Sequence, residues 1–81
     1  MGSVNSDFST ALAVVIKKHR LAKGLSQNQL SKISGVSQTY VGEVERGMYS
    51  PTVDVASALA EALGIPFSKM AAEAEKLRGK A

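Results

Sequence analysis

The sequence has no cysteine and no tryptophan, and its aromatic residues amount to 5% of the chain. Without cysteine the chain can form neither disulfide bonds nor thiolate metal sites, so its core must be aliphatic. No apolar run approaches the roughly 18 residues that a membrane span requires, and no basic segment followed by a long apolar stretch marks a secretory signal. These absences predict a soluble, cytoplasmic protein with no membrane partner.

The groups that enzymes use are also scarce. The chain has a single histidine, His19, no glycine-rich phosphate loop after a strand, and no strand pattern at all. Its acidic residues are spread along helical segments in a way that solvated helix faces explain. We therefore expect no enzymatic activity, no cofactor and no metal site, and no small-molecule ligand is evident from the sequence. We also expect His19 to be a solvent-facing helical residue.

What is present suits one small all-α domain. A chain of 81 residues buries only about 60 to 65% of its unfolded surface, which leaves modest stability and makes oligomerisation useful. We expect the domain to span residues 7–78, between a flexible N-terminus at 1–6 and a tail at 79–81. The first residues, MGSVNS, formally match a myristoylation pattern, but a flexible terminus or a remnant of an expression vector explains them as well.

Two short amphipathic segments lie between Gln27 and Gly47, joined at Gly35 by a stretch too brief for anything but a sharp turn. Their apolar residues recur at intervals of three or five, as expected if one face of each helix is buried. Such a pair is the helix-turn-helix arrangement, which makes DNA the leading partner. The positions expected to point inward are Leu30, Ile33, Val36, Val41 and Val44.

Local signals define the ends of these two helices. Ser26 followed three residues later by Gln29 predicts a reciprocal capping box, so the first helix should begin near residue 27. Gly35 supplies the left-handed backbone position that ends it, Ser37 can cap the second helix, and Gly47 ends that one.

The same region resembles the Cro and phage-repressor type of helix-turn-helix domain, the XRE-like family that includes small restriction-modification controller proteins. The resemblance rests on the run GLSQNQLSKISGVSQTYVGEVERG, a following Pro-Thr step, and ALAEALGI; it covers roughly Leu12 to Met70. It implies a compact five-helix, lambda-repressor-like fold, with the helix-turn-helix as helices two and three, and binding to an operator. One departure is Ser31, where the family usually has alanine; the added hydroxyl calls for a local hydrogen bond rather than a different fold.

Base reading is expected at the exposed start of the third helix. Gln38 is the first choice because an amide both donates and accepts, which matches adenine N6 and N7. Thr39 can bond a base edge or place its methyl against that of thymine, and Glu43 can accept from cytosine N4 or disfavour wrong sites. Gly42 costs about 1 kcal/mol in a helix interior, and close approach to the duplex would explain it. The resemblance implies that Gln27 contacts a phosphate and braces Gln38.

Phosphate contacts are expected from polar residues around the helix pair. Tyr40 has an equally favoured alternative, in which its ring simply packs beside the turn. The candidates are Asn28, Ser37, Tyr40, Arg46, Tyr49 and Ser50.

The resemblance also implies an internal ion pair between Arg20 of the first helix and Glu45 near the end of the third. Such a pair ties two helices together, and removing one partner would strand the other charge. Its role is therefore expected to be structural rather than recognitional.

Positive charge is concentrated near the helix pair. From Lys17 to Arg46 six basic residues stand against two acidic ones, a balance of +4, whereas from Pro51 onward four basic and four acidic residues cancel. This placement suits attraction to phosphates. Individually, Lys17, Lys18 and Lys23 are better explained as solvated residues.

The rest of the chain predicts three more helices: one over residues 6–23, one from Pro51 or Thr52 to Gly64, and one from near Pro66. The apolar stripe of the last helix extends further than packing on four small helices requires. We expect part of it to be buried against a second copy; the alternative is a helix that folds back entirely on its own core. The expected dimer-interface residues are Phe67, Met70, Ala74 and Leu77.

These observations predict a sequence-specific double-stranded DNA-binding transcriptional regulator, a repressor or controller. It would bind a palindromic operator as a homodimer, with the third helix in the major groove and half-sites about 34 Å or a small multiple of that apart. The alternative is a helical protein-interaction module, or an antitoxin-like protein, with the same fold. A steep salt dependence of binding would favour DNA.

Overall fold

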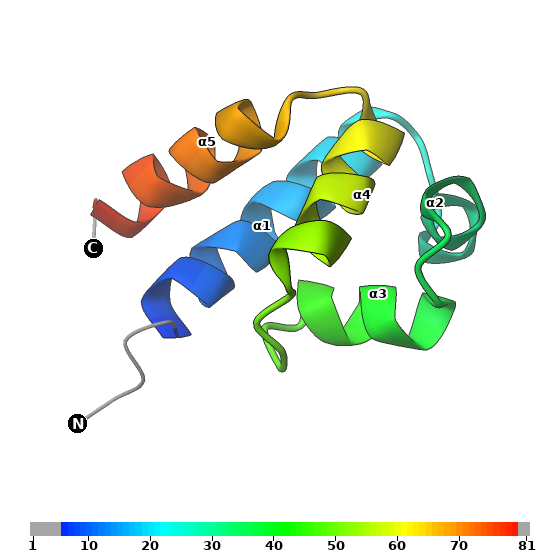
Figure 1. The fold of residues 1–81 in the computed structure, drawn as a ribbon, viewed down its shortest axis with the longest axis horizontal. Helices are drawn as coiled ribbons and strands as arrows, with labels where there is room; N and C mark the ends of the chain where they lie inside the picture. The colour runs from blue at the N-terminus through cyan, green and yellow to red at the C-terminus, as the bar shows by residue number, and fades with distance from the viewer. Residues whose placement is uncertain (1–5, 80–81) are drawn as a thin grey trace.

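Five helices make up the computed structural model, which describes residues 6–79 (Figure 1). No strand occurs between these residues, so the all-α class and the expected helix order are confirmed. Residues 1–5 of the expected flexible N-terminus, where the myristoylation pattern begins, and residues 80–81 of the expected tail lie outside the described residues, whereas Ser6 begins the first helix and Gly79 ends the last. The helices are α1 (Ser6–Ala22), α2 (Gln27–Ser34), α3 (Gln38–Glu45), α4 (Val53–Leu63) and α5 (Phe67–Gly79).

The ends of α2 and α3 are set by the predicted caps. Ser26 Oγ accepts from the Gln29 backbone N–H at 3.0 Å, and the Ser26 N–H donates to Gln29 Oε1 at 2.8 Å, which completes the capping box. Gly35 ends α2 with φ of 80°, a conformation in which a side chain is strained. Ser37 Oγ then accepts from the Tyr40 N–H at 3.2 Å and starts α3. The sharp turn between the helices is therefore encoded locally.

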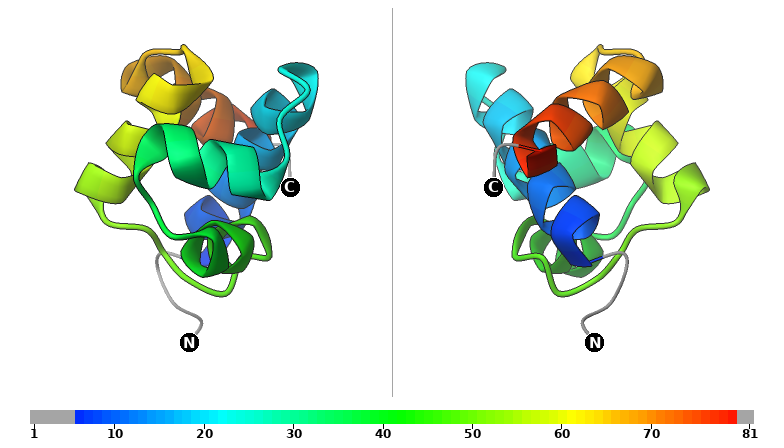
Figure 2. Two further views of the ribbon diagram at one scale, coloured as in Figure 1. Left: turned by 90° about the vertical axis from the view of Figure 1, so that its right-hand side faces the viewer. Right: turned by 90° about the vertical axis from the view of Figure 1, so that its left-hand side faces the viewer.

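The helices are arranged so that α3 is separated from α5. Helix α5 packs along α1, while α2 packs against α3 and α4. In Figure 2, α2 faces the viewer in the left panel, and α1 and α5 face the viewer in the right panel. Helix α3 is the lowest helix in both panels. The helix-turn-helix and the C-terminal helix thus occupy different sides of the molecule.

The core is aliphatic, as the composition predicted, and all five helices contribute to it. Four of the five apolar positions expected to point inward from the helix pair are buried. The largest side chains that are almost completely buried are Ile16, Leu30, Val41, Val44, Leu59, Leu63 and Met70.

The prediction for Ile33 was wrong, because 58% of this residue is exposed. Helix α2 lies at the edge of the domain, so only a narrow stripe centred on Leu30 is buried. Val36, beyond the turn, contributes the next buried side chain. The Ser31 hydroxyl was also expected to form a local hydrogen bond. Among residues 6–79 it forms none, and serine is accommodated at this position of α2 without one.

Two of the four expected dimer-interface residues belong instead to the core of the chain itself. Met70 and Ala74 are both 0% exposed, because α5 packs along α1 and turns its apolar stripe inward. They offer no surface to a second copy, so the prediction for these two was wrong. Phe67 is half-buried against the core, and Leu77 is 39% exposed.

His19 does not face solvent as expected. Only 18% of its side chain is exposed, and its Nε2 lies 2.8 Å from Glu73 Oε1 on α5. Lys18 Nζ lies 3.8 Å from the same oxygen. Periodicity along α1 could not reveal this contact, because the partner lies on a helix 54 residues further along the chain.

The His19–Glu73 contact predicts a dependence of stability on pH. The hydrogen bond from His19 lowers the pKa of Glu73 below its ordinary value of 4.5, and the positive charges of His19, Lys18 and Lys69 act in the same direction, against the opposing effect of burial. A carboxyl whose pKa is lowered by folding stabilises the protein above its unfolded pKa and loses this contribution as the pH falls. Between about pH 5.5 and pH 3 the wild type should therefore lose more stability than Glu73→Gln.

Urea unfolding of both proteins at the two pH values measures this difference. Glu61→Gln, at an exposed position of α4, is the matched control and should follow the wild type. Equal acid losses for Glu73→Gln and the wild type would contradict a stabilising contact between α1 and α5.

Candidate nucleic-acid interface

The exposed start of α3 forms one wall of a shallow hollow. Gln38 and Thr39 are exposed there, as expected for residues that contact the bases of a bound duplex. The hollow is lined by side chains from both helices of the pair, with Gln27 coming from α2. Its lining residues are Gln27, Gln38, Thr39, Gly42 and Arg46, all of which the sequence had singled out.

Behind this hollow lies the expected ion pair between α1 and α3. Arg20 Nε donates to Glu45 Oε2 at 2.7 Å, and Arg20 Nη2 donates to Glu45 Oε1 at 3.0 Å, a bidentate arrangement. Only 9% of the Arg20 side chain and 2% of the Glu45 side chain are exposed. The third guanidinium nitrogen, Nη1, donates to the Leu25 carbonyl oxygen at 2.7 Å, so the charge is well satisfied although buried.

Gln27 is connected to this ion pair. Its Nε2 donates to Glu45 Oε1 at 3.1 Å. A carboxylate only accepts hydrogen bonds, so the amide nitrogen must face Glu45 and the amide oxygen must face away from it. The ion pair therefore sets the orientation of a residue at the candidate interface, which neither periodicity nor charge counting indicated. The bracing of Gln38 by Gln27 stays a prediction.

Gly42 is buried beneath side chains of the same interface. A Cβ atom at this position would lie 3.3 Å from Arg46 Nη1 and 3.4 Å from Gln27 Oε1. The sequence suggested that the glycine allows close approach of a duplex. In the structure two protein side chains border that space, and the close approach of a duplex stays a prediction.

The phosphate candidates differ in how available they are. Asn28, Arg46 and Tyr49 are exposed, and Arg46 Nε donates to Met48 Sδ at 3.5 Å. Ser37 is exposed but its oxygen caps α3, so its hydroxyl hydrogen is the part left to donate. Among the base-reading candidates, Glu43 was the weaker one, and its side chain is half-buried, so part of it remains accessible.

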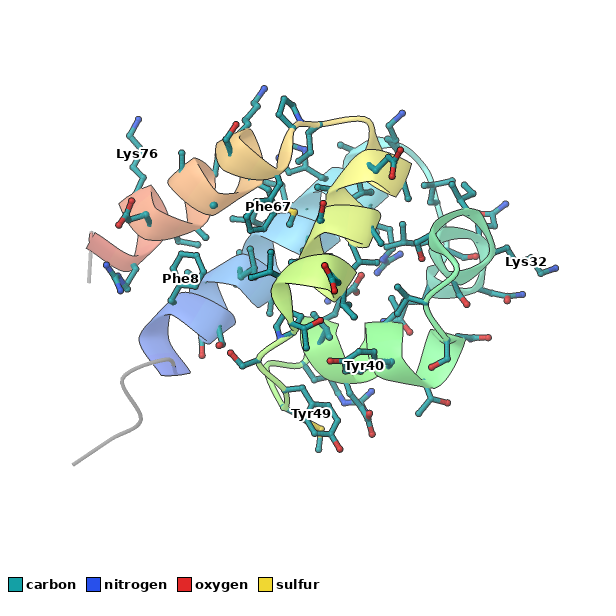
Figure 3. All side chains as sticks on the ribbon, viewed as in Figure 1. Phe8, Lys32, Tyr40, Tyr49, Phe67 and Lys76 are labelled. Atoms are coloured by element: carbon teal, nitrogen blue, oxygen red, sulfur yellow. The ribbon has the colours of Figure 1, made fainter. Side chains whose placement is uncertain are left out.

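The ring of Tyr40 packs against the core, which is one of the two roles that the sequence suggested for it. It is half-buried against the core and meets the Tyr49 ring edge-on, with ring centroids 5.7 Å apart and planes inclined by 71°. In Figure 3 both residues lie at the lower side of the molecule, Tyr40 at α3 and Tyr49 below it. Tyr40 is only half-buried, and a phosphate contact from its hydroxyl stays a prediction.

Ser9 was missed by sequence reasoning. It is 6% exposed, and its Oγ lies 2.6 Å from Ser50 Oγ, which joins α1 to the loop between α3 and α4. This loop also holds Tyr49. The sequence signal was weak: a serine on an otherwise apolar stretch of α1, with a partner 41 residues away.

Charge near the interface is less one-sided than the sequence balance indicated. Arg20 is neutralised by Glu45, and Lys18 lies beside Glu73 of α5. Lys32 and Lys76 extend from opposite ends of the molecule in Figure 3. Arg46 is therefore the basic residue placed directly at the hollow.

Between residues 6 and 79 there is no cluster of three or more histidine or acidic side chains that could hold a metal ion. No helix in the same part of the chain is long and apolar enough to cross a membrane.

Comparison with known proteins assigns the family. The family model described as "Helix-turn-helix" (HTH_3) matches residues 16–70. Control protein C.SmaI from Serratia marcescens is 38% identical over 64 residues, which cover 79% of this chain and 76% of that protein. The chain also spans about a third of two longer curated relatives, 32% and 36% of their lengths.

Solved structures agree with this assignment. The clp gene regulator ClgR from Corynebacterium glutamicum has a TM-score of 0.83 and 26% identity, over 89% of this chain and 77% of that chain. The restriction-modification controller protein C.AhdI from Aeromonas hydrophila has a TM-score of 0.74 and 35% identity, over 76% of this chain and 94% of that chain. The resemblance inferred from the motifs is thus confirmed, and the chain belongs to the XRE-like helix-turn-helix family.

Proposed function

We propose that this chain is a transcriptional regulator that recognises a specific double-stranded DNA operator by inserting α3 into the major groove. One observation supports the proposal above all: Gln38, Thr39 and Arg46 meet Gln27 around a single hollow at the exposed side of α3. The family and the relatives named above are helix-turn-helix regulators, so the chain is a regulator rather than an enzyme.

The side chains fit the two kinds of contact that DNA requires. Gln38 offers the donor and acceptor that adenine N6 and N7 require, and Thr39 can contact a thymine methyl. Glu43 can accept from cytosine N4. These residues would supply sequence preference, while phosphate contacts would fix the register of the protein on the duplex. The phosphate contacts are proposed for Asn28, Ser37, Tyr40, Arg46, Tyr49 and Ser50.

The proposed active form is a homodimer on a two-fold symmetric operator. A single helix pair reaches one half-site, and two copies would read half-sites about 34 Å apart or a small multiple of that distance. Exposed apolar side chains for such an interface remain between α1 and α5, where Val14 is 51% and Leu77 39% exposed. The interface proposed here is centred on Leu77, with Phe67 at its edge, and excludes the buried Met70 and Ala74.

The names of the relatives suggest a more specific role. C.SmaI is a control protein and C.AhdI is a restriction-modification controller protein. Control of a restriction-modification operon, as repressor or activator, is the version of the proposal that these names favour.

Selection from a randomised duplex library at one near-physiological salt concentration tests the proposal. The wild type should enrich a two-fold symmetric motif. Gln38→Ala should relax the preference at one base pair per half-site, because a lost bidentate contact costs about 1 to 3 kcal/mol of discrimination against the wrong base.

Glu75→Ala, whose side chain is 70% exposed on α5, is the control variant and should enrich the same motif as the wild type. No enrichment by the wild type would overturn sequence-specific binding. An identical motif for wild type and Gln38→Ala would leave DNA binding standing but remove Gln38 from base reading.

The exposed apolar residues between α1 and α5 also favour a second candidate, a helical protein-interaction module or antitoxin-like protein. Salt dependence separates the two. Operator binding should weaken with a log-log slope of about −0.9 per phosphate contacted, whereas capture of a partner protein through Val14 and Leu77 should respond little to salt.

A further inference from the structure

We propose that Gly42 is a positioning residue, which leaves room on α3 for the Gln27 amide oxygen and the Arg46 guanidinium to lie over the helix and face the duplex. The inference rests on the proposed function and extends it, because it explains what positions Gln27 and Arg46 at the hollow on α3. It also replaces the expectation that the glycine admits the duplex itself.

The position of the Gln27 oxygen supports this first. Glu45 holds the amide nitrogen at 3.1 Å, so the oxygen points the other way. It points toward Gly42: a Cβ there would be 3.4 Å from Gln27 Oε1 but 4.0 Å from Gln27 Cδ. An acceptor is thus presented at the hollow that Gln38 also lines.

Arg46 occupies the other side of the same space. It lies one turn after Gly42, so side chains at these two positions are neighbours on the helix surface. Its Nη1 would be 3.3 Å from a Cβ on residue 42. A methyl group would therefore press on the guanidinium, which must shift by a few tenths of an ångström, and would fill the space up to the amide oxygen, at the near limit of ordinary contact.

The neighbours are not equally free to shift. Arg46 is exposed and contacts Met48 Sδ at 3.5 Å, a weak bond. Gln27 is held by a carboxylate that is itself fixed by two bonds from Arg20. Alanine at position 42 should hence displace the Arg46 guanidinium and crowd the Gln27 amide without disturbing the core, since both groups that the methyl meets are the ends of side chains.

Gly42→Ala separates this role from a structural one. Alanine favours helix, so the melting temperature should equal or exceed that of the wild type. Affinity for the selected operator should nevertheless fall about fivefold to tenfold, the lower range for a lost bidentate contact. Preference should relax at the base pair assigned to Gln38. Gly79→Ala is the matched control, because its added methyl meets nothing within 4 Å, and it should bind like the wild type.

A double variant identifies the group through which Gly42 acts. In at least one of the two backgrounds Gln27→Ala and Arg46→Ala, the loss caused by Gly42→Ala should shrink to about twofold or less, since coupled positions are not additive. An undiminished loss in both Gln27→Ala and Arg46→Ala backgrounds would overturn the inference, because the methyl would then be meeting the duplex itself.

A measurement without DNA keeps this inference distinct from the proposed function. The side-chain amide signals of Gln27 in a ¹H–¹⁵N spectrum, assigned by their absence in Gln27→Ala, should move in Gly42→Ala and stay in place in Gly79→Ala. Unmoved signals would overturn the positioning role even if the operator binds. Moved signals with no DNA binding by the wild type would support the role of Gly42 and refute the proposed function.

Discussion

Replacing Glu45 by alanine is expected to lower the free energy of unfolding by about 3 to 5 kcal/mol, because it leaves the buried Arg20 charge without a partner. The Arg20 side chain is only 9% exposed and donates two hydrogen bonds to Glu45, at 2.7 and 3.0 Å. A domain of this size has a total stability of roughly 5 to 15 kcal/mol, so the variant should be close to unfolding at growth temperature. Thermal and urea denaturation measure the loss.

Two further variants serve as controls for Glu45→Ala. Glu75→Ala removes an exposed carboxylate that lies 3.7 Å from Arg78 Nη2, and it should change stability by less than about 0.5 kcal/mol. The double variant Arg20→Met with Glu45→Leu should recover much of the loss, since a packed apolar pair often matches a buried ion pair. An unchanged melting temperature for Glu45→Ala would contradict a buried pair.

Replacing Met70 by alanine is expected to lower the free energy of unfolding by about 2 to 5 kcal/mol, because it opens a cavity in the core. Met70 is 0% exposed, although its place in the apolar stripe of α5 suggested an interface between two copies. The cost should therefore appear at protein concentrations low enough to keep the chain monomeric. Denaturation over a range of concentrations measures it.

Leu77→Ala is the matched comparison on the same helix. Leu77 is 39% exposed, so this variant should reduce stability far less than Met70→Ala and should weaken self-association in analytical ultracentrifugation. Normal monomer stability for Met70→Ala combined with weakened self-association would contradict the inward packing of α5.

Local contacts explain what could be predicted about the helix pair. The capping box of Ser26 and Gln29, the left-handed Gly35 and the Ser37 cap each involve groups no more than four residues apart. Such interactions depend on residue type and spacing, both of which the sequence states directly. The ion pair of Arg20 with Glu45 spans 25 residues, and family resemblance rather than spacing predicted it.

Longer-range contacts explain what could not be predicted. Helical spacing identifies an apolar stripe but not the neighbour that buries it. It gave the same expectation for Ile33, which is exposed, as for Leu30, which is buried. It also gave no sign that His19 contacts Glu73 on α5, at 2.8 Å.

The sequence by itself determined an all-α domain, the boundaries of its helix-turn-helix and the residues that line the candidate interface, because caps, turns and periodicity act within a few residues. Only the tertiary structure decided how those residues are oriented. Glu45 turns the Gln27 amide, and Gly42 lies beneath Gln27 and Arg46, because α1, α2 and α3 meet behind the hollow. Packing between helices distant in the chain sets such orientations, and no local pattern records it.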